Sequence, residues 1–211
     1  MAIDFSSLGT PTQSNNVQEV VSSSPGITLN LDKGSVLNLQ KAAPSLENLD
    51  LGAGWDTAAF GEAFDLDITA FLLNANNKIT GANDVIYFNN PKGNGIKLNG
   101  DNRTGEGDGD DEVISVQLSQ ISPSVQKIIF SVVIFQAREK GQTFGQVNNS
   151  YIRLVNKNNG NEVAKFQLKN DFSTETAVIF GELVRNGDTW LFHAIGEGLD
   201  ADLNQLAQRF Q

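Results

Sequence analysis

The sequence contains no cysteine and only one histidine among its 211 residues. Without cysteine the chain cannot form disulfides, thiolate metal sites or a cysteine nucleophile, which fits a reducing cytoplasm. No general acid–base pair and no Ser–His arrangement can be built around the single histidine, His193. We therefore expect a protein that is not an enzyme.

Long hydrophobic runs and excess positive charge are also missing. The longest apolar run, IIFSVVIF at 128–135, is the length of a strand and far short of the ~20 residues that span a bilayer. Residues 1–16 have neither the basic nor the apolar region of a secretory signal. There are 15 basic and 25 acidic residues, so the net charge of −10 disfavours nucleic acid and anionic membrane surfaces as partners. These features predict a cytoplasmic protein without direct membrane insertion.

What is present points to one folded domain. Hydrophobic residues make up 39% of the chain and include 13 phenylalanines, enough for a packed core. Residues 1–25 are instead rich in Ser, Thr, Asn and Gln and end at Pro25-Gly26. We expect a flexible N-terminal extension over 1–25 and a domain over 26–211.

The pattern in the domain is mostly that of strands. Residues 63–73 alternate, with apolar side chains on one face and Asp65, Asp67 and Thr69 on the other. The run 128–135 is apolar on both faces and predicts a central, covered strand. Turn sequences at 32–35, 157–160 and 186–188 predict three hairpins, and apolar residues at helical spacing predict an amphipathic helix over 200–210. The expected fold is an all-β antiparallel β-sandwich with a C-terminal helix.

One stretch of the chain concentrates acidic residues and glycines. Residues 100–113 read GDNRTGEGDGDDEV, with six carboxylates, four glycines and one basic residue, Arg103. Glycine allows tight turns that aim carbonyls inward, and carboxylates are the hard oxygen ligands that calcium prefers. Two carboxylates about 5 Å apart repel by roughly 3 kcal/mol at an effective dielectric of ~20, so a compact loop needs a cation between them. A solvated acidic loop without an ion is the alternative.

The carboxylates of the alternating strand favour the cation. Asp65 and Asp67 lie two residues apart on one face, where their mutual repulsion needs a cause. They either face water at a sheet edge or close the same cation site from across the sheet. A glycosidase pair is conceivable, but their adjacency on one strand and the nearby acidic loop favour a metal.

Known calcium motifs fit the loop poorly. Arg103 occupies the third position after Asp101, where an EF-hand loop needs an oxygen ligand. The Gly-x-Gly-x-Asp pattern of calcium-binding β-helices occurs only once, although that architecture needs tandem copies. The loop also lacks the Gly-Lys-Ser/Thr of a phosphate-binding loop, and its carboxylates would repel phosphate.

Several blocks of the chain resemble a known family. In order they are LDKG at 31–34, LGAGWD at 51–56, FDLD at 64–67, VIYFNN at 85–90, GDNRTGEGDGDDE at 100–112, FGQV at 144–147, YIRLV at 151–155 and WLFHAIG at 190–196. Together they resemble the tellurite-resistance TerD family of bacterial stress proteins over roughly 26–211. The family pattern says nothing of 1–25. Where the family usually has Leu-Gly-Trp-Asp, this chain has the variant LGAGWD. We expect the variation to alter a turn rather than the site.

The resemblance implies a calcium-binding β-sandwich with two closely spaced ions, acting in resistance to tellurite and other stresses. Its implied partners are other Ter proteins, including a membrane-embedded one. With the residue pattern, it predicts a ligand set composed of Asp65, Asp67, Asp101, Asn102, Thr104, Asp108, Asp110, Asp111 and Glu112. Thr104 and the glycines are expected to contribute through backbone carbonyls.

Other conspicuous residues have structural interpretations. His193 alternates with Leu191 and Ile195, so we expect it to be packed on an apolar face. We expect Trp55, Phe144, Tyr151 and Phe166 in the core. Two alternative functions stay open: a calcium-independent scaffold whose acidic loop docks on a basic protein, and a metal-dependent hydrolase, for which no base or nucleophile is visible.

Overall fold

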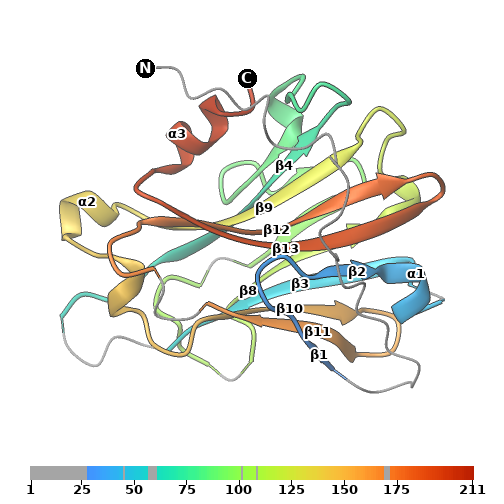
Figure 1. Cartoon of the computed structure of the whole chain (residues 1–211). Helices are drawn as coiled ribbons and strands as arrows, with labels where there is room; N and C mark the ends of the chain where they lie inside the picture. Colours follow the sequence, from blue (N-terminus) through green and yellow to red (C-terminus); the bar gives the residue numbers. More distant parts are fainter. Residues whose placement is uncertain (1–27, 45, 57–60, 101, 108, 169–171) are drawn as a thin grey trace.

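The computed structural model of the chain describes residues 28–44, 46–56, 61–100, 102–107, 109–168 and 172–211. Across these residues, two β-sheets pack face to face and a few short helices lie around them (Figure 1). The predicted β-sandwich is thus confirmed. The extension predicted over 1–25 lies outside the described residues.

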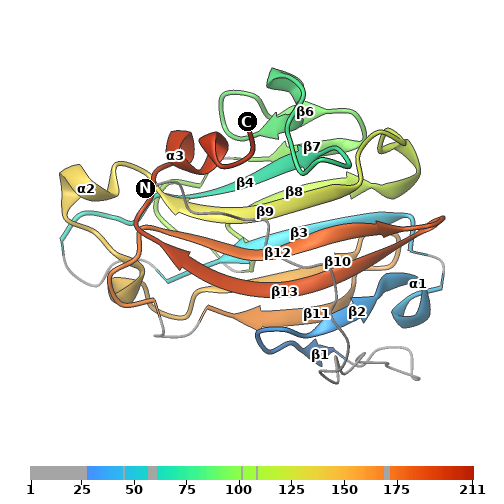
Figure 2. The same ribbon diagram turned by 45° about the horizontal axis from the view of Figure 1, so that its top comes forward.

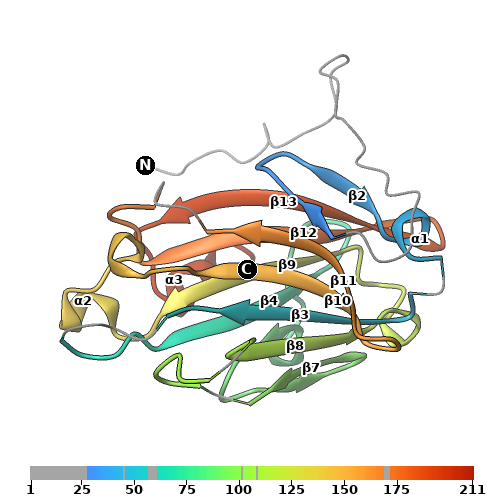
Figure 3. The same cartoon turned by 90° about the horizontal axis from the view of Figure 1, so that it is seen from below.

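One sheet has seven strands in the described part of the chain, and Figure 3 views it from its outer side. In spatial order its strands are β1 (Leu29–Asn30), β11 (Asn161–Gln167), β10 (Tyr151–Asn156), β3 (Asn48–Gly54), β8 (Glu112–Gln117), β7 (Ile96–Asn99) and β6 (Lys92–Gly93). All neighbours are antiparallel except β1 and β11.

The second sheet has six strands in the same residues. In spatial order they are β2 (Val36–Asn38), β13 (Thr189–Leu199), β12 (Ala177–Asn186), β9 (Lys127–Ile134), β4 (Leu66–Leu73) and β5 (Val85–Ile86). The helices are α1 (Leu39–Ala42), α2 (Ala137–Lys140) and α3 (Leu203–Gln208), with 3-10 turns η2 (Ala82–Asp84), η3 (Leu118–Gln120) and η4 (Phe144–Gln146). None of the helices in the described residues has the length and apolar character needed to cross a bilayer.

Alternation along the strands builds the core. On β4, Leu66, Ile68 and Ala70 face the space between the sheets, while Phe71 and Leu73 belong to a second apolar cluster on the outer face. Strand β9 lies between β12 and β4 and is buried on both faces, as its apolar run predicts. The central strands therefore contribute to two cores at once.

Two of the three predicted hairpins are confirmed, namely β10 with β11 and β12 with β13. The hairpin predicted at 32–35 is wrong, because β1 and β2 belong to different sheets. Leu31 N–H donates to the carbonyl of Lys165 in one sheet, whereas Gly34 N–H donates to that of Ala194 in the other (2.8 Å each). The turn is therefore a crossover between the sheets.

The C-terminal helix is shorter than predicted. Leu199 ends strand β13, and α3 spans Leu203–Gln208. The helix lies on the outer face of the six-stranded sheet (Figure 2), where Leu206 is fully buried. The ring of Phe210 packs 5.1 Å from that of Phe71, between centroids. The predicted packing of an apolar helical face on a sheet is confirmed.

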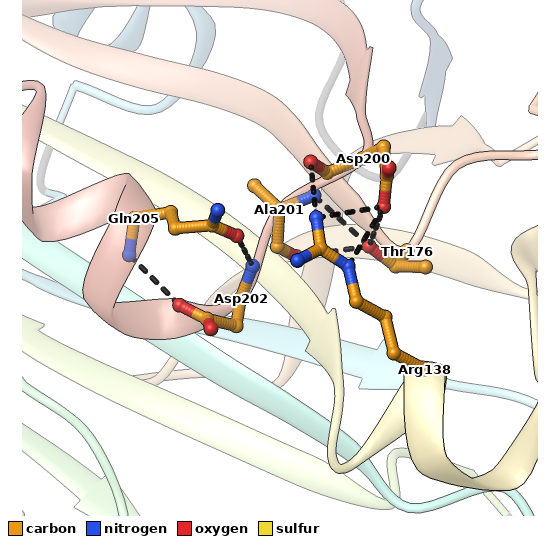
Figure 4. Close-up of polar contacts among 6 residues, drawn as sticks. All are labelled: Arg138, Thr176, Asp200, Ala201, Asp202 and Gln205. Carbon is orange, nitrogen blue, oxygen red and sulfur yellow. Dashed lines mark hydrogen bonds and ion pairs between the residues drawn. The ribbon is translucent and has the colours of Figure 1, made fainter.

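Polar contacts fix the start of this helix (Figure 4). Oδ1 of Asp202 accepts the N–H of Gln205 at 2.8 Å, and Oε1 of Gln205 accepts the N–H of Asp202 at 2.9 Å. This reciprocal cap satisfies two backbone donors that a helix N-terminus leaves open. Arg138 of α2 pairs with Asp200 at 3.2 Å, and the hydroxyl of Thr176 lies 3.5 Å from the same carboxylate. A helix of six residues thus gains its position from caps and packing.

Candidate functional site

Strand β4 presents the Asp-Leu-Asp segment as its alternation predicts. Asp67 lies on the face opposite Leu66 and Ile68 and is only 7% exposed. Asp65 is half-buried just before the strand, and its carbonyl accepts the N–H of Phe135 at 2.8 Å. Burial of an ionisable carboxylate is costly unless a donor or a cation stabilises it. This end of β4 is therefore a candidate site for positive charge.

Glu112 joins the acidic loop to this strand. It is the first residue of β8, in the other sheet, and is 1% exposed. Its Oε2 accepts the N–H of Ile68 at 2.7 Å. Short strand β5 pairs with β4 only at Ala70 and Phe71, so the edge of β4 beside Ile68 can receive the carboxylate. The structure thus brings the end of the acidic loop against the backbone of the Asp-Leu-Asp segment.

Asp111 and Asn102 shape the loop itself. Oδ2 of Asp111 accepts the N–H of Trp55 at 2.9 Å, and its Oδ1 accepts the amide of Asn102 at 2.7 Å. The side-chain oxygen Oδ1 of Asn102 accepts the N–H groups of Thr104 and Gly105, both at 3.1 Å. Burial raises the pKa of Asp111; the Trp55 N–H opposes this, and the charges of Asp110 and Asp56 add to it. An additional cation nearby would favour the ionised form.

Asp110 points away from Asp111 and Asn102. Its Oδ1 lies 2.7 Å from Nε of Arg153 on the outer face of the seven-stranded sheet. The hydroxyl of Tyr151 donates to the carbonyl of Gly109 at 2.7 Å and lies 3.2 Å from Oδ1 of Asp110. Arginine and tyrosine of β10 therefore anchor the loop where it crosses the sheet, and Asp110 has a protein cation as its partner.

The anchoring residues were not identified from the sequence. Tyr151 was predicted in the core, which is wrong: it is half-buried on the outer face, because Ile152 and Leu154 take the inward positions of β10. Strict alternation in YIRLV could have revealed this. Burial and the charge of Asp110 raise the pKa of Tyr151 to about 12, although Arg153 opposes the shift. The phenol thus stays a donor at neutral pH.

The LGAGWD block was expected to alter a turn, and this is also wrong. Its glycines, Gly52 and Gly54, lie within β3 and alternate with Leu51 and Ala53, which face the core. A Cβ at Gly52 would stand 2.1 Å from Oδ2 of Asp110, and one at Gly54 would stand 2.5 Å from the Tyr151 ring. The bare outer face of β3 is therefore the surface on which the anchored loop rests.

The remaining predicted ligands are Thr104, Asp101 and Asp108. Oγ1 of Thr104 accepts the N–H of Glu106 at 3.3 Å. Asp101 and Asp108 lie outside the described residues. Among the residues that are described, no three His, Cys, Asp or Glu side chains come close enough to hold a metal. The polar side chains of the loop and of the Asp-Leu-Asp segment offer oxygen atoms, which are the ligand type of a hard cation rather than of a soft one.

His193 lies elsewhere, on the outer face of the six-stranded sheet. It is half-buried beside Leu191 and Ile195, in agreement with the predicted packed position. Its Nδ1 is 3.1 Å from Oε1 of Glu182, and Lys127 lies 3.0 Å from the other oxygen of that carboxylate. Burial by itself raises the pKa of Glu182, but His193 and Lys127 outweigh it, so the pKa is lowered. The imidazole has a structural partner here.

Comparison with known proteins agrees with these features. The TerD domain matches residues 27–210. The chain is 45% identical over 187 residues to the tellurium resistance protein TerD of Serratia marcescens, covering 87% of this chain and 97% of that protein. It is 42% identical over 185 residues to general stress protein 16U of Bacillus subtilis (strain 168), covering 86% and 96% respectively.

A solved structure shares the fold. The crystal structure of a homologue of telluride resistance protein (TerD) from Streptomyces coelicolor A3(2) superposes with a TM-score of 0.64 at 24% identity, covering 77% of this chain and 96% of that one. The domain match and the curated relatives extend over most of the sequence, and the β-sandwich is the same. This chain belongs to the TerD family of tellurium resistance and general stress proteins.

Proposed function

We propose that this chain is a calcium-binding stress-response protein that presents a calcium-dependent surface to other proteins. The observation that carries the proposal is the 2.7 Å hydrogen bond from Ile68 N–H to Oε2 of Glu112. It ties two acidic segments, distant in sequence, at one edge of the sandwich. Buried carboxylates gathered in this way repel one another unless a cation lies among them.

The oxygen donors suit calcium better than other metals. Asp67 would contribute from β4 and Asp65 from just before it. Asn102, Asp111 and Glu112 would contribute from the loop, together with Asp101 and Asp108. Six to eight oxygens are the usual number around calcium, so this set suffices for one ion and, with shared carboxylates, for two. Asp110 would join only if it left Arg153, so we expect it to act mainly as an anchor.

The role of the bound ion would be recognition. Ordering of the acidic loop would offer a new surface to other Ter-type proteins in the cytoplasm, among them a membrane-embedded one, and no catalytic step is required. The relatives are named as tellurium resistance and general stress proteins, which supports a role in stress.

Thermal unfolding with calcium tests the proposal. At one hundred times the dissociation constant, one site adds about 2.7 kcal/mol, which raises Tm by roughly 5–11 °C for a domain of this size. The double variant Asp65→Asn/Asp67→Asn should lose most of this gain. Asp188→Asn, in an exposed turn, should keep it. Titration calorimetry with calcium and magnesium gives the affinities, and a wild-type Tm unmoved by millimolar calcium would contradict the proposal.

A calcium-independent scaffold is the second candidate. The bonds of Asp111 to Trp55 and Asn102 support it, because protein donors alone can hold this part of the loop. Loss of calcium binding in the double Asn variant with full retention of partner binding would favour the scaffold.

A further inference from the structure

Four asparagines of the chain are followed directly by glycine, namely Asn94, Asn99, Asn159 and Asn186. This dipeptide can react with itself in water. The backbone nitrogen of the glycine attacks Cγ of the asparagine, since no Cβ on the glycine hinders the approach. Ammonia leaves as a five-membered succinimide closes, and water then opens the ring to aspartate or isoaspartate. One amide and one water are consumed, and one carboxylic acid and one ammonia are formed.

The fold protects Asn99 through its side chain. Nδ2 of Asn99 donates to Oγ of Ser115 at 2.8 Å and to the carbonyl of Val113 at 3.3 Å. Cγ can reach the next backbone nitrogen only if the side chain leaves both acceptors. Each of these hydrogen bonds therefore lowers the population of the reactive conformation.

The turn between β10 and β11 protects Asn159 through both reacting groups. The N–H of Gly160, whose nitrogen is the nucleophile, donates to the carbonyl of Asn156 at 2.8 Å. Oδ1 of Asn159 accepts the N–H of Asn161 at 2.9 Å. Attack would need both hydrogen bonds to break first.

Asn94 has an exposed side chain, but the glycine after it is packed. The carbonyl of Gly95 accepts the N–H of Gln117 at 2.7 Å. A Cβ at Gly95 would stand 2.8 Å from the backbone of Gln120, so this turn lies tightly against its neighbour. We expect partial protection here.

Asn186 has none of these restraints. It ends β12 at the tip of the β12–β13 hairpin, which turns at the right of Figure 1, and Asn186, Gly187 and Asp188 are all exposed. Within the described part of the chain, no hydrogen bond engages the Asn186 side chain or the N–H of Gly187. A Cβ at Gly187 would meet nothing within 4 Å, so no other segment packs on the turn. We infer that Asn186 is a modification site, where the side-chain amide converts to a carboxylate with water as the co-reactant.

The hairpin tolerates this change. Beside the site, Cζ of Arg185 lies 4.3 Å from the centroid of the Trp190 ring, and Nε donates to the carbonyl of Val125 at 2.9 Å. These contacts hold the strands together next to the terminal pair of Asn186 and Thr189. The product adds one negative charge at an exposed tip, and isoaspartate also inserts a methylene into the main chain. Converted protein should melt within about 2 °C of fresh protein.

Peptide mapping by mass spectrometry follows all four sites in one experiment. The full chain is incubated at pH 8 in water labelled with oxygen-18, so that each new carboxylate carries the label. Asn186 should convert about tenfold faster than Asn99 and Asn159, because the hydrogen bonds of those two must break before attack. Purified isoaspartyl methyltransferase with labelled S-adenosylmethionine counts the isoaspartate fraction independently. In guanidinium chloride the four pairs should react at similar rates, because the fold no longer protects any of them.

Two variants separate the fold from the local sequence. Asn186→Gln keeps an amide but would need a six-membered ring, so labelling at this position should disappear while the other three sites are unchanged. Ser115→Ala removes one acceptor of the Asn99 amide and should raise the Asn99 rate about twofold to tenfold. The rate at Asn186 should not change in that variant. Circular dichroism melts confirm that both variants fold.

Three results would overturn the inference. They are equal rates at Asn186 and Asn99 in the folded chain, an Asn186 that reacts only in guanidinium chloride, and a rate at Asn186 that rises with Ser115→Ala. Asn186 lies at the opposite end of β12 from Ala177, whose neighbour Val133 pairs with Asp67. The rate should therefore be the same with calcium or a chelator, so it does not depend on the proposed function.

Discussion

Three buried or half-buried carboxylates in this acidic chain are held by specific donors. Glu112 accepts the N–H of Ile68 and Asp111 that of Trp55, while Glu182 lies between His193 and Lys127. A carboxylate removed from water keeps its charge only if such partners replace the lost hydration. Single residues therefore set how stability responds to pH.

Replacement of Glu182 by glutamine tests this effect. The pKa of Glu182 is lowered from 4.5 in the folded protein, so its stabilisation is present above pH 4.5 and is lost as pH falls through the lowered value. Glu182→Gln should be less stable at pH 7 by about 1–2 kcal/mol, because the charged hydrogen bonds weaken. Urea unfolding at pH 7 and pH 3 should show the difference narrowing in acid.

Glu197→Gln serves as the control for this measurement. Glu197 pairs with Arg209 but is 40% exposed, and exposed pairs contribute little, so the change should stay within about 0.5 kcal/mol. A deficit of Glu182→Gln that stays constant from pH 7 to pH 3 would show that packing, and not charge, is responsible.

At the scale of elements, strand β3 has two different faces. Leu49, Leu51 and Ala53 fill the core, whereas Gly52 and Gly54 leave the outer face bare. The anchored part of the acidic loop occupies that bare face through Asp110. A strand interior normally disfavours glycine, and here the close approach of another segment accounts for it.

Gly52→Ala should break this fit. The new Cβ would overlap the Asp110 carboxylate, so either the loop moves off the sheet or the sheet distorts, at a cost of about 1–3 kcal/mol. Urea unfolding gives the cost, and the NMR signal of Arg153 Nε–H reports whether its pair with Asp110 survives. Gly81→Ala, where the Cβ meets nothing within 4 Å, should change stability by less than ~0.5 kcal/mol.

At the scale of the whole molecule, the acidic loop is held by both sheets. Oε2 of Glu112, at the end of the loop, accepts the N–H of Ile68 in the six-stranded sheet. On the outer face of the seven-stranded sheet, the hydroxyl of Tyr151 donates to the carbonyl of Gly109 in the loop, and the ammonium of Lys165 lies 3.8 Å above the same ring. Loss of either contact should therefore change the conformation of the loop.

Tyr151→Phe keeps the ring beneath Lys165 but removes the hydroxyl that contacts Gly109. If the loop binds calcium, this variant should bind it about twofold to tenfold more weakly, because the loop loses one of the hydrogen bonds that hold it on the sheet. Calorimetric titration with calcium measures the change, and an affinity equal to that of the wild type would show that this contact does not order the loop.

The sequence by itself determined that β4 and β9 are strands and what chemistry their faces carry. Alternation on β4 assigned Leu66 and Ile68 to the core and Asp67 to the other side, and the unbroken apolar run of β9 predicted burial on both faces. The crowding of carboxylates at 100–112 predicts a hard cation as the ligand, since hard oxygens suit hard cations. These properties are local, because each depends only on the period of a residue's own strand or on composition.

Only the tertiary structure decided which elements meet. No local pattern tells that β1 and β2 enter different sheets, that Glu112 reaches the backbone of Ile68 from 44 residues away, or that Asp110 turns outward to Arg153. A strand's period states which side chains share a face, but not what that face packs against. That depends on how the two sheets stack and where their edges end, which is a property of the whole chain.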